Sequence, residues 1–183
     1  MKNRIILLLS VILTTMISCR TQSVKEVDIC IYGGTSAGVI AAYTAQQSGK
    51  SVLLIEPGRH LGGMSSGGLG FTDIGNKYVV QGLALDFYRR LGTHYGKLEQ
   101  WIFEPSVAET IFKDYIKRAG IEVWYENRLS DVEKQRNSIT TITLEDSKHP
   151  NHTTNRKVRA KVFIDCSYEG DLMAKSGVSY IVG

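Results

Sequence analysis

The spacing of apolar and polar residues along the chain predicts alternating strands and helices. Residues 27–32 and 51–55 are short and almost wholly apolar, as in strands that are covered on both faces. Residues 37–48 lie between them and carry small side chains every four positions, which predicts a helix packed closely against a sheet. The expected face is Ala37, Ala41 and Ala45, with Gly38 and Ala42 beside them. The pattern predicts an α/β fold with a doubly wound, Rossmann-like parallel sheet.

Two longer helices are predicted in the middle of the chain. Residues 77–91 have a helical stripe of apolar side chains, which Gly92 is expected to end. Ser106 and Glu109 have the spacing of a capping box, and the apolar face that follows continues to a second terminator, Gly120. Aromatic side chains of this region are expected to pack in the core. These are Trp101, Phe103 and Tyr115.

From residue 121 onwards, the spacing of apolar residues changes from that of a helix to that of a strand. Residues 121–125 are predicted to form another parallel strand. Residues 132–134 and 139–144, with a turn at Asn137 and Ser138, predict a small β-meander inserted in the α/β unit. Residues 146–155 are polar and predict a loop.

The first residues of the chain have the pattern of an export signal. Lys2 and Arg4 precede an apolar run of 13 residues, whereas a helix that spans a bilayer needs about 20. Ser18 followed by Cys19 resembles the lipobox of bacterial lipoproteins, in which the cysteine becomes lipidated. We therefore expect a signal peptide over 1–19, a tether over 20–26 and a domain over 27–183.

This pattern predicts an exported protein that is anchored through Cys19 on the periplasmic or outer side of a bacterial membrane. The alternative is ordinary cleavage nearby, with Cys19 lost or left as a free thiol. The formal net charge of +4 becomes 4 − 2 = +2 when Lys2 and Arg4 are removed. Such a small charge does not predict a nucleic-acid partner.

Composition fits one globular domain with neither a disulfide scaffold nor a metal site. Hydrophobic residues make up 43% of the 183 residues and charged residues 22%. With Cys19 lipidated, only Cys30 and Cys166 remain, and Cys30 is expected to be a core residue. His149 and His152 lie in the polar loop without further ligands at matching spacing, so a solvated loop is favoured over a metal site.

The glycine-rich turn after the first strand has the spacing of a dinucleotide-binding site. It leads into a helix whose N-terminus offers N–H groups and partial positive charge to a pyrophosphate. Thr35 stands where the G-x-G-x-x-G pattern has its middle glycine, and its hydroxyl could donate to phosphate. The expected cofactor residues of this turn are Gly33, Gly34, Thr35, Ser36, Ala37 and Gly38.

A carboxylate at the end of the second strand strengthens this interpretation. Glu56 lies 23 residues after Gly33, close to the offset of about 20 residues at which an acidic side chain binds the ribose of the cofactor. A carboxylate in this position disfavours a 2′-phosphate, so NADP is not expected.

A second glycine cluster follows Glu56 at residues 57–68. With this cluster the sequence resembles the FAD-dependent oxidoreductases of glutathione-reductase-like architecture, in which a Leu-Gly-Gly turn lies along the pyrophosphate and ribityl chain. The resemblance implies cofactor contacts at Gly62, Gly63 and Met64. Arg59 is open to two interpretations, a group that neutralises phosphate charge or a solvated loop residue.

The segment after residue 162 resembles the third FAD motif of the same family. An apolar strand ends in Asp165, and Gly170 and Asp171 match the Gly-Asp pair that binds the ribityl chain in the family. Cys166, Ser167 and Tyr168 replace the usual Ala-Thr-Gly segment, which leaves the shape of this turn open.

The resemblance extends over residues 27–183 and implies FAD as cofactor and hydride transfer between an organic small-molecule substrate and flavin. It covers only the amino-terminal part of such flavoproteins, so a substrate domain is expected to be missing and no catalytic residue is assigned. One alternative is an NAD-binding dehydrogenase domain, against which the second glycine cluster argues. Another is a truncated, non-catalytic remnant or partner-binding module.

Overall fold

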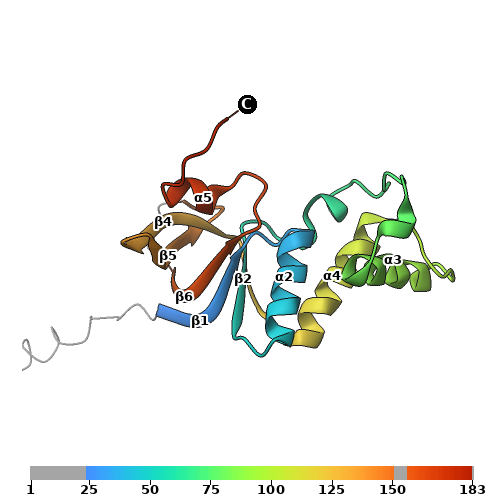
Figure 1. Cartoon of the computed structure of the whole chain (residues 1–183), viewed down its shortest axis with the longest axis horizontal. Helices are drawn as coiled ribbons and strands as arrows, with labels where there is room; N and C mark the ends of the chain where they lie inside the picture. Colours follow the sequence, from blue (N-terminus) through green and yellow to red (C-terminus); the bar gives the residue numbers. More distant parts are fainter. Residues whose placement is uncertain (1–23, 151–155, 183) are drawn as a thin grey trace, which may run out of the picture.

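The computed structural model describes residues 24–150 and 156–182, which form one mixed sheet with helices (Figure 1). The strands are β1 (Val24–Tyr32), β2 (Val52–Glu56), β3 (Glu122–Tyr125), β4 (Asn127–Gln135), β5 (Ser138–Asp146) and β6 (Arg156–Asp165). The helices are α2 (Ser36–Gln47), α3 (Gly82–His94), α4 (Pro105–Ala119) and α5 (Asp171–Lys175), with short 3-10 turns η1 (Gly63–Ser65) and η2 (Lys77–Val79). The expected signal peptide, Cys19, His152 and Gly183 lie outside the described residues.

The sheet has the strand order β3-β2-β1-β6-β5-β4. β1 pairs in parallel with both β2 and β6, and β2 pairs in parallel with β3, whereas β5 is antiparallel to β4 and β6. The predicted α/β fold with a Rossmann-like parallel sheet is therefore confirmed. Because β1, β2 and β6 run in the same direction, the turns that follow them meet at one edge of the sheet.

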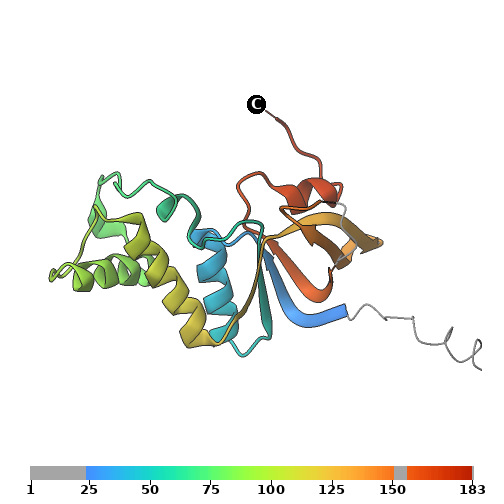
Figure 2. The same ribbon diagram turned by 180° about the vertical axis from the view of Figure 1, so that it is seen from behind.

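One face of the sheet is covered by helices α2 and α4, with α3 packed outside them (Figure 1, Figure 2). Ile31 and Leu54 point from the strands into this layer and are fully buried. The aromatic residues Phe103 and Tyr115 belong to the same cluster, and Trp101 is also buried, so their prediction as core residues is confirmed.

The face of α2 that packs on the sheet matches part of the predicted stripe, at Gly38 and Ala42. Its buried residues are Gly38, Val39 and Ala42, whereas Ala37 is exposed. The buried face is thus centred on the Gly38 and Ala42 side of the stripe, where Gly38 makes the closest approach. A Cβ atom on Gly38 would lie 1.9 Å from the carbonyl oxygen of Gly33.

The opposite face is covered by strands, where a doubly wound sheet usually has helices. β4 and β5 curl over β1 and β2, and the backbone N–H of Leu129 in β4 donates to the hydroxyl of Tyr32 in β1 at 3.2 Å (Figure 1). A single residue, Glu126, separates β3 from β4 and has a left-handed φ of 56°. The two predicted strands of the meander are thus present within β4 and β5, and the turn between them lies at residues 136–137, one residue earlier than predicted.

Two expectations about the bounds of elements were wrong. Residues 24–26, expected in the tether, extend β1, because Val24 to Glu26 pair with Lys157 to Arg159 and Glu26 forms an ion pair with Arg159 at 2.6 Å. The helix expected over 77–91 is broken between η2 and α3, because Gln81 is extended (φ −132°, ψ 173°) at the start of α3. Tertiary pairing and backbone geometry override the local pattern at both places.

Gly92 lies within α3 and does not end it. A Cβ atom there would lie 2.6 Å from the backbone nitrogen of Glu99, so the glycine allows the following loop to return across the helix. The predicted capping box also fails, because α4 begins at Pro105 and Glu109 instead binds Lys113 at 2.7 Å. Gly120 does end α4, with φ +64°, as predicted.

Cys30 is fully buried in β1, as predicted, and burial raises the pKa of its thiol. Burial and then the carboxylate of Asp165 raise the pKa of Cys166 as well. Both are free cysteines. In the part of the chain that the structure describes, no helix is both long and apolar enough to cross a membrane.

Gly38→Ala is expected to lower the free energy of unfolding by about 1–3 kcal/mol, the usual cost of overpacking a tight contact. The added methyl group would collide with the Gly33 carbonyl and separate α2 from the turn after β1. Urea denaturation followed by circular dichroism measures the change. Gly75→Ala is the matched control, because a Cβ atom there has nothing within 4 Å. Equal stability of the two variants would contradict this account of the contact.

Candidate cofactor site

The turn after β1 brings three segments of the chain together. Gly33 has φ +100°, and a Cβ atom on it would lie 2.6 Å from the backbone nitrogen of Ser167 in the turn after β6. A Cβ atom on Gly34 would lie 2.7 Å from the carboxylate of Glu56 at the end of β2. Neither position has room for a side chain. These glycines therefore allow the turns after β1, β2 and β6 to touch.

Thr35 is the N-cap residue of α2. This role explains why a threonine can occupy the position of the middle glycine in the G-x-G-x-x-G pattern. Its buried hydroxyl accepts from the N–H of Gly38 at 3.2 Å and donates to the carbonyl of Cys166 at 2.9 Å. The hydroxyl hydrogen is thus directed to the carbonyl and not to a phosphate, which had been the expected role. The N-terminus of α2, at Ser36 and Ala37, lies beside these turns, and the helix dipole favours an anion there.

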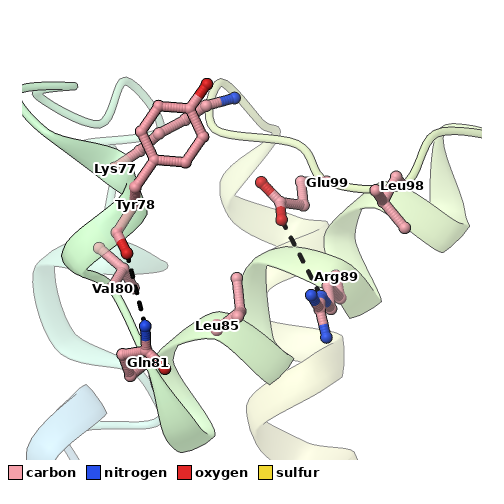
Figure 3. A pocket seen from close by; sticks show the side chains of 8 residues that line it. All are labelled: Lys77, Tyr78, Val80, Gln81, Leu85, Arg89, Leu98 and Glu99. Carbon is pink, nitrogen blue, oxygen red and sulfur yellow. Dashed lines mark hydrogen bonds and ion pairs between the residues drawn. The ribbon is translucent and has the colours of Figure 1, made fainter.

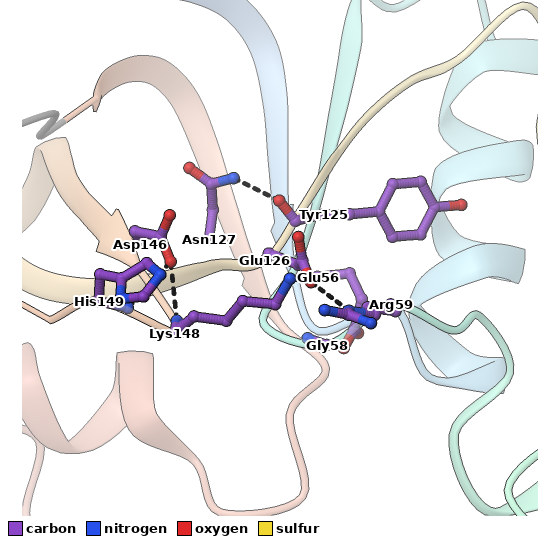
Figure 4. Close-up of polar contacts among 9 residues, drawn as sticks. All are labelled: Glu56, Gly58, Arg59, Tyr125, Glu126, Asn127, Asp146, Lys148 and His149. Atoms are coloured by element: carbon purple, nitrogen blue, oxygen red, sulfur yellow. Dashed lines mark hydrogen bonds and ion pairs between the residues drawn. The ribbon is translucent and has the colours of Figure 1, made fainter.

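Glu56 ends β2 beside this turn (Figure 4). One carboxylate oxygen accepts from the N–H of Gly34 at 2.7 Å, and the other accepts from the N–H of Gly58 at 2.5 Å. Each oxygen of a carboxylate can accept more than one hydrogen bond. Glu56 therefore fixes both glycine turns and still has acceptor capacity for the hydroxyl groups of a ribose.

The charged residues after Glu56 pair with protein groups. Arg59 forms an ion pair with Glu126, which also binds Lys148 at 2.6 Å (Figure 4). The hydrogen bond from Lys148, followed by that from Arg59, lowers the pKa of Glu126. His60 lies on the surface with Nδ1 3.0 Å from Glu109. In this arrangement Arg59 faces the junction of β3 and β4, not the glycine turn.

The second glycine cluster is bound directly to the first. The N–H of Gly62 donates to the carbonyl of Gly34 at 2.8 Å, and Thr35 and Gly62 form an isolated parallel bridge. A Cβ atom on Gly62 would lie 2.3 Å from the ring of Phe112 in α4, so this position also requires glycine. The structure thus places the Leu-Gly-Gly turn beside the N-terminus of α2.

The third motif forms an ordered turn although its middle residues differ from the family pattern. One oxygen of Asp165 accepts from the N–H and the hydroxyl of Ser167, at 3.0 and 2.7 Å, and the other accepts from the N–H of Met173 in α5 at 3.0 Å. The Ser167 hydroxyl in turn accepts from the N–H of Gly170 at 3.1 Å. Asp165 therefore shapes the turn and holds α5.

Asp171 lies on the other side of this turn, toward the β4–β5 face. Its carboxylate is 3.5 Å from the hydroxyl of Tyr32. Burial, and then the carboxylates of Asp171 and Asp165, raise the pKa of Tyr32 to about 12, so the hydroxyl stays protonated and can donate. Tyr32 and Asp171 line a polar cavity of about 450 Å³ with Arg128.

Two other cavities differ in their relation to these turns. One, of about 340 Å³, is mainly apolar and begins at Ser36 and Ala37, then runs between α2, α3 and α4. The other, of about 460 Å³, lies at the start of α3 between Tyr78, Arg89 and neighbouring residues (Figure 3). It contains none of the predicted cofactor residues. The first cavity therefore adjoins the candidate site and the second does not.

Sequence reasoning missed Tyr168. Its hydroxyl accepts from the N–H of Met64 at 2.7 Å and so joins the third motif to the second. An aromatic residue in a turn gives no local signal of such a contact, and only its position two residues before Gly170 in the motif could have indicated it. Among the described residues, no group of three or more histidine, cysteine or acidic side chains could hold a metal ion.

Comparison with known proteins fits this geometry. The model of the family described as FAD dependent oxidoreductase matches residues 28–183. The chain belongs to the FAD-dependent oxidoreductase family. FAD is the cofactor of this family, and the convergence of three glycine-containing turns on a helix N-terminus and a ribose-type carboxylate fits it.

The chain is also similar to particular proteins. It is 26% identical over 122 residues to a thiamine thiazole synthase of Pyrococcus horikoshii, covering 65% of this chain and 47% of that protein. It is 27% identical over 157 residues to the same enzyme of Pyrococcus abyssi, covering 82% and 60%. The crystal structure of Thermovibrio ammonificans THI4 shares the fold, with a TM-score of 0.60, 22% identity and coverage of 96% and 71%. The chain thus spans about half the length of the curated relatives.

Glu56→Gln is expected to weaken FAD binding by about 1–3 kcal/mol, because the amide presents a donor where the carboxylate has an acceptor. One of the groups around Glu56, a backbone N–H or a ribose hydroxyl, then loses its partner. Titration of the protein with FAD by flavin fluorescence measures the effect. Glu104→Gln, at an exposed position before α4, is the control. Unchanged FAD affinity in Glu56→Gln would remove Glu56 from the site.

Proposed function

We propose that this chain binds FAD across the turns after β1, β2 and β6 and serves as the FAD-binding part of an oxidoreductase. The complete enzyme would move a hydride between an organic small molecule and the flavin. The observation that carries the proposal is the meeting of the three turns at one edge of the sheet, with Gly33, Gly34 and Gly62 in direct contact with their neighbours. Such an edge is the usual ligand site of parallel α/β sheets.

The chain's own residues divide the work of binding. The N-terminus of α2 at Ser36 and Ala37 would hold the pyrophosphate through N–H groups and the helix dipole. Glu56 would accept from the ribose, and the turn at Gly62 and Gly63, packed against Phe112 and Tyr168, would lie along the cofactor. When bound, FAD supplies the hydride chemistry, and the protein supplies orientation and electrostatics.

The hydrogen bond between the N–H of Gly62 and the carbonyl of Gly34 also helps to decide between FAD and NAD as the cofactor. An NAD domain does not need a second glycine turn fixed to the first, so this contact favours FAD over NAD. These residues do not identify the substrate or the activity of the whole enzyme, because the chain matches only 47% and 60% of the length of the curated relatives.

A direct test measures FAD and NAD binding by the purified protein. We expect FAD to bind and to raise the melting temperature, since a ligand present at 100 times its Kd adds about 2.7 kcal/mol of stability. NAD at the same concentration is expected to have no effect. Circular dichroism shows that the protein is folded in both assays. A folded protein that does not bind FAD would refute the proposal. A protein that binds NAD more tightly than FAD would indicate an NAD-binding dehydrogenase domain.

We further propose that the protein is exported and anchored to a bacterial membrane through lipid on Cys19. The support is the basic start, the apolar run of 13 residues and the Ser18–Cys19 junction. An anchor at Cys19 would hold the cofactor domain outside the cytoplasm, with residues 20–23 of the sequence between the lipid and β1.

Cys19→Ala is expected to abolish lipidation and to move the protein from the detergent phase to the aqueous phase in a detergent phase-separation experiment. Mass spectrometry of the N-terminal peptide shows whether acyl groups are attached. Thr21→Ala, two residues further on, is the control and should partition as the wild type does. An unlipidated wild-type protein with the same partition as Cys19→Ala would refute the anchor.

A further inference from the structure

Tyr168 links the third motif to the second glycine cluster through an unusually close contact with a glycine. Its hydroxyl oxygen accepts from the N–H of Met64 at 2.7 Å. A Cβ atom on Gly63 would lie 2.1 Å from that oxygen and 2.9 Å from the adjacent ring carbon. The phenol group therefore lies directly against the Gly63 backbone, in space that any other residue at position 63 would fill.

The hydrogen-bond pattern leaves this hydroxyl able to donate. A tyrosine hydroxyl has one hydrogen to give and also accepts, and here the acceptor side receives the N–H of Met64. An N–H that donates to a hydroxyl polarises it and strengthens it as a donor. Tyr168 is 57% exposed, so it remains accessible between the two turns.

The hydroxyl of Thr35, unlike that of Tyr168, is not available to donate to a cofactor. The hydroxyl of Thr35 is buried, and its hydrogen is directed to the carbonyl of Cys166. It stands in the place of the glycine that lets the backbone approach the pyrophosphate. The Thr35 hydroxyl hydrogen is therefore used within the protein, whereas the Tyr168 hydroxyl beside the second glycine turn has a hydrogen left to donate.

We propose that Tyr168 is a positioning residue for FAD. Its hydroxyl donates to an oxygen of the segment that joins the adenosine and the flavin ring, the pyrophosphate or the ribityl chain, while Met64 and Gly63 hold the phenol in place. The inference rests on the proposed FAD binding. It differs from it in assigning a donor to the part of the third motif that departs from the family pattern.

Tyr168→Phe tests the donor, because it keeps the ring and removes only the hydroxyl. We expect the affinity for FAD to fall about fivefold to tenfold, the loss of one hydrogen bond to a polar or charged group. The affinity for AMP, which contains the adenosine end alone, should stay unchanged. Flavin fluorescence gives the FAD affinity and calorimetry the AMP affinity. Tyr78→Phe, at a position 81% exposed and far from the turns in sequence, is the matched control.

Gly63→Ala tests the contact from the other side, since its methyl group would displace the phenol. It should reproduce the selective loss of FAD affinity. Gly96→Ala, where φ is +68° and a Cβ atom has nothing within 4 Å, controls for backbone strain. Thermal melts of every variant report folding.

The outcomes separate the two proposals. A wild-type protein that does not bind FAD refutes the proposed function itself. If the wild type binds FAD, then equal or tighter FAD binding by Tyr168→Phe overturns the role of Tyr168, and tighter binding would identify the side chain as an obstruction. Equal weakening of FAD and AMP binding would also overturn it, because a merely structural role would affect both ligands.

Discussion

The close contact between Gly38 and Gly33 is the constraint on which the rest of the site depends. A Cβ atom on Gly38 would lie 1.9 Å from the Gly33 carbonyl, so α2 begins within van der Waals distance of the turn that precedes it. That approach sets the position of the helix N-terminus relative to β1. Gly33 in turn rests on the backbone of Cys166 and Ser167. The first and third motifs are therefore in direct backbone contact, and the Thr35 hydroxyl adds a hydrogen bond to the carbonyl of Cys166.

The three carboxylates near these turns have different tasks, which their hydrogen bonds distinguish. Both oxygens of Asp165 receive donors from the turn after β6 and from α5, so it is chiefly structural. Glu56 receives one backbone N–H from each glycine turn and keeps acceptor capacity. Asp171 lies near a protonated tyrosine hydroxyl. The sequence alone gives all three the same appearance, an acidic residue at the end of a strand or the start of a helix.

The periodicity of the chain was enough to predict the central parallel strands β1 and β2, because burial on both faces leaves a strong apolar pattern in residues 27–32 and 51–55. It failed where a residue serves a distant segment. Gly92 has the pattern of a helix end, yet it lies inside α3 because the loop at Glu99 needs the space. Tyr168 is invisible to local reasoning for the same reason, since its partner Met64 lies 104 residues away.

Glu126 has a consequence for the edges of the sheet. It alone separates β3 from β4, although these strands lie at opposite ends of the strand order, so the two edges are tied together at one end. Exposed edge strands can pair with other chains and lead to aggregation. Here one edge has only four residues, and the other carries charged side chains such as Asp131, Glu133 and Lys134. Neither edge of the curled sheet therefore presents a long strand without charged side chains to which a strand of another molecule could pair.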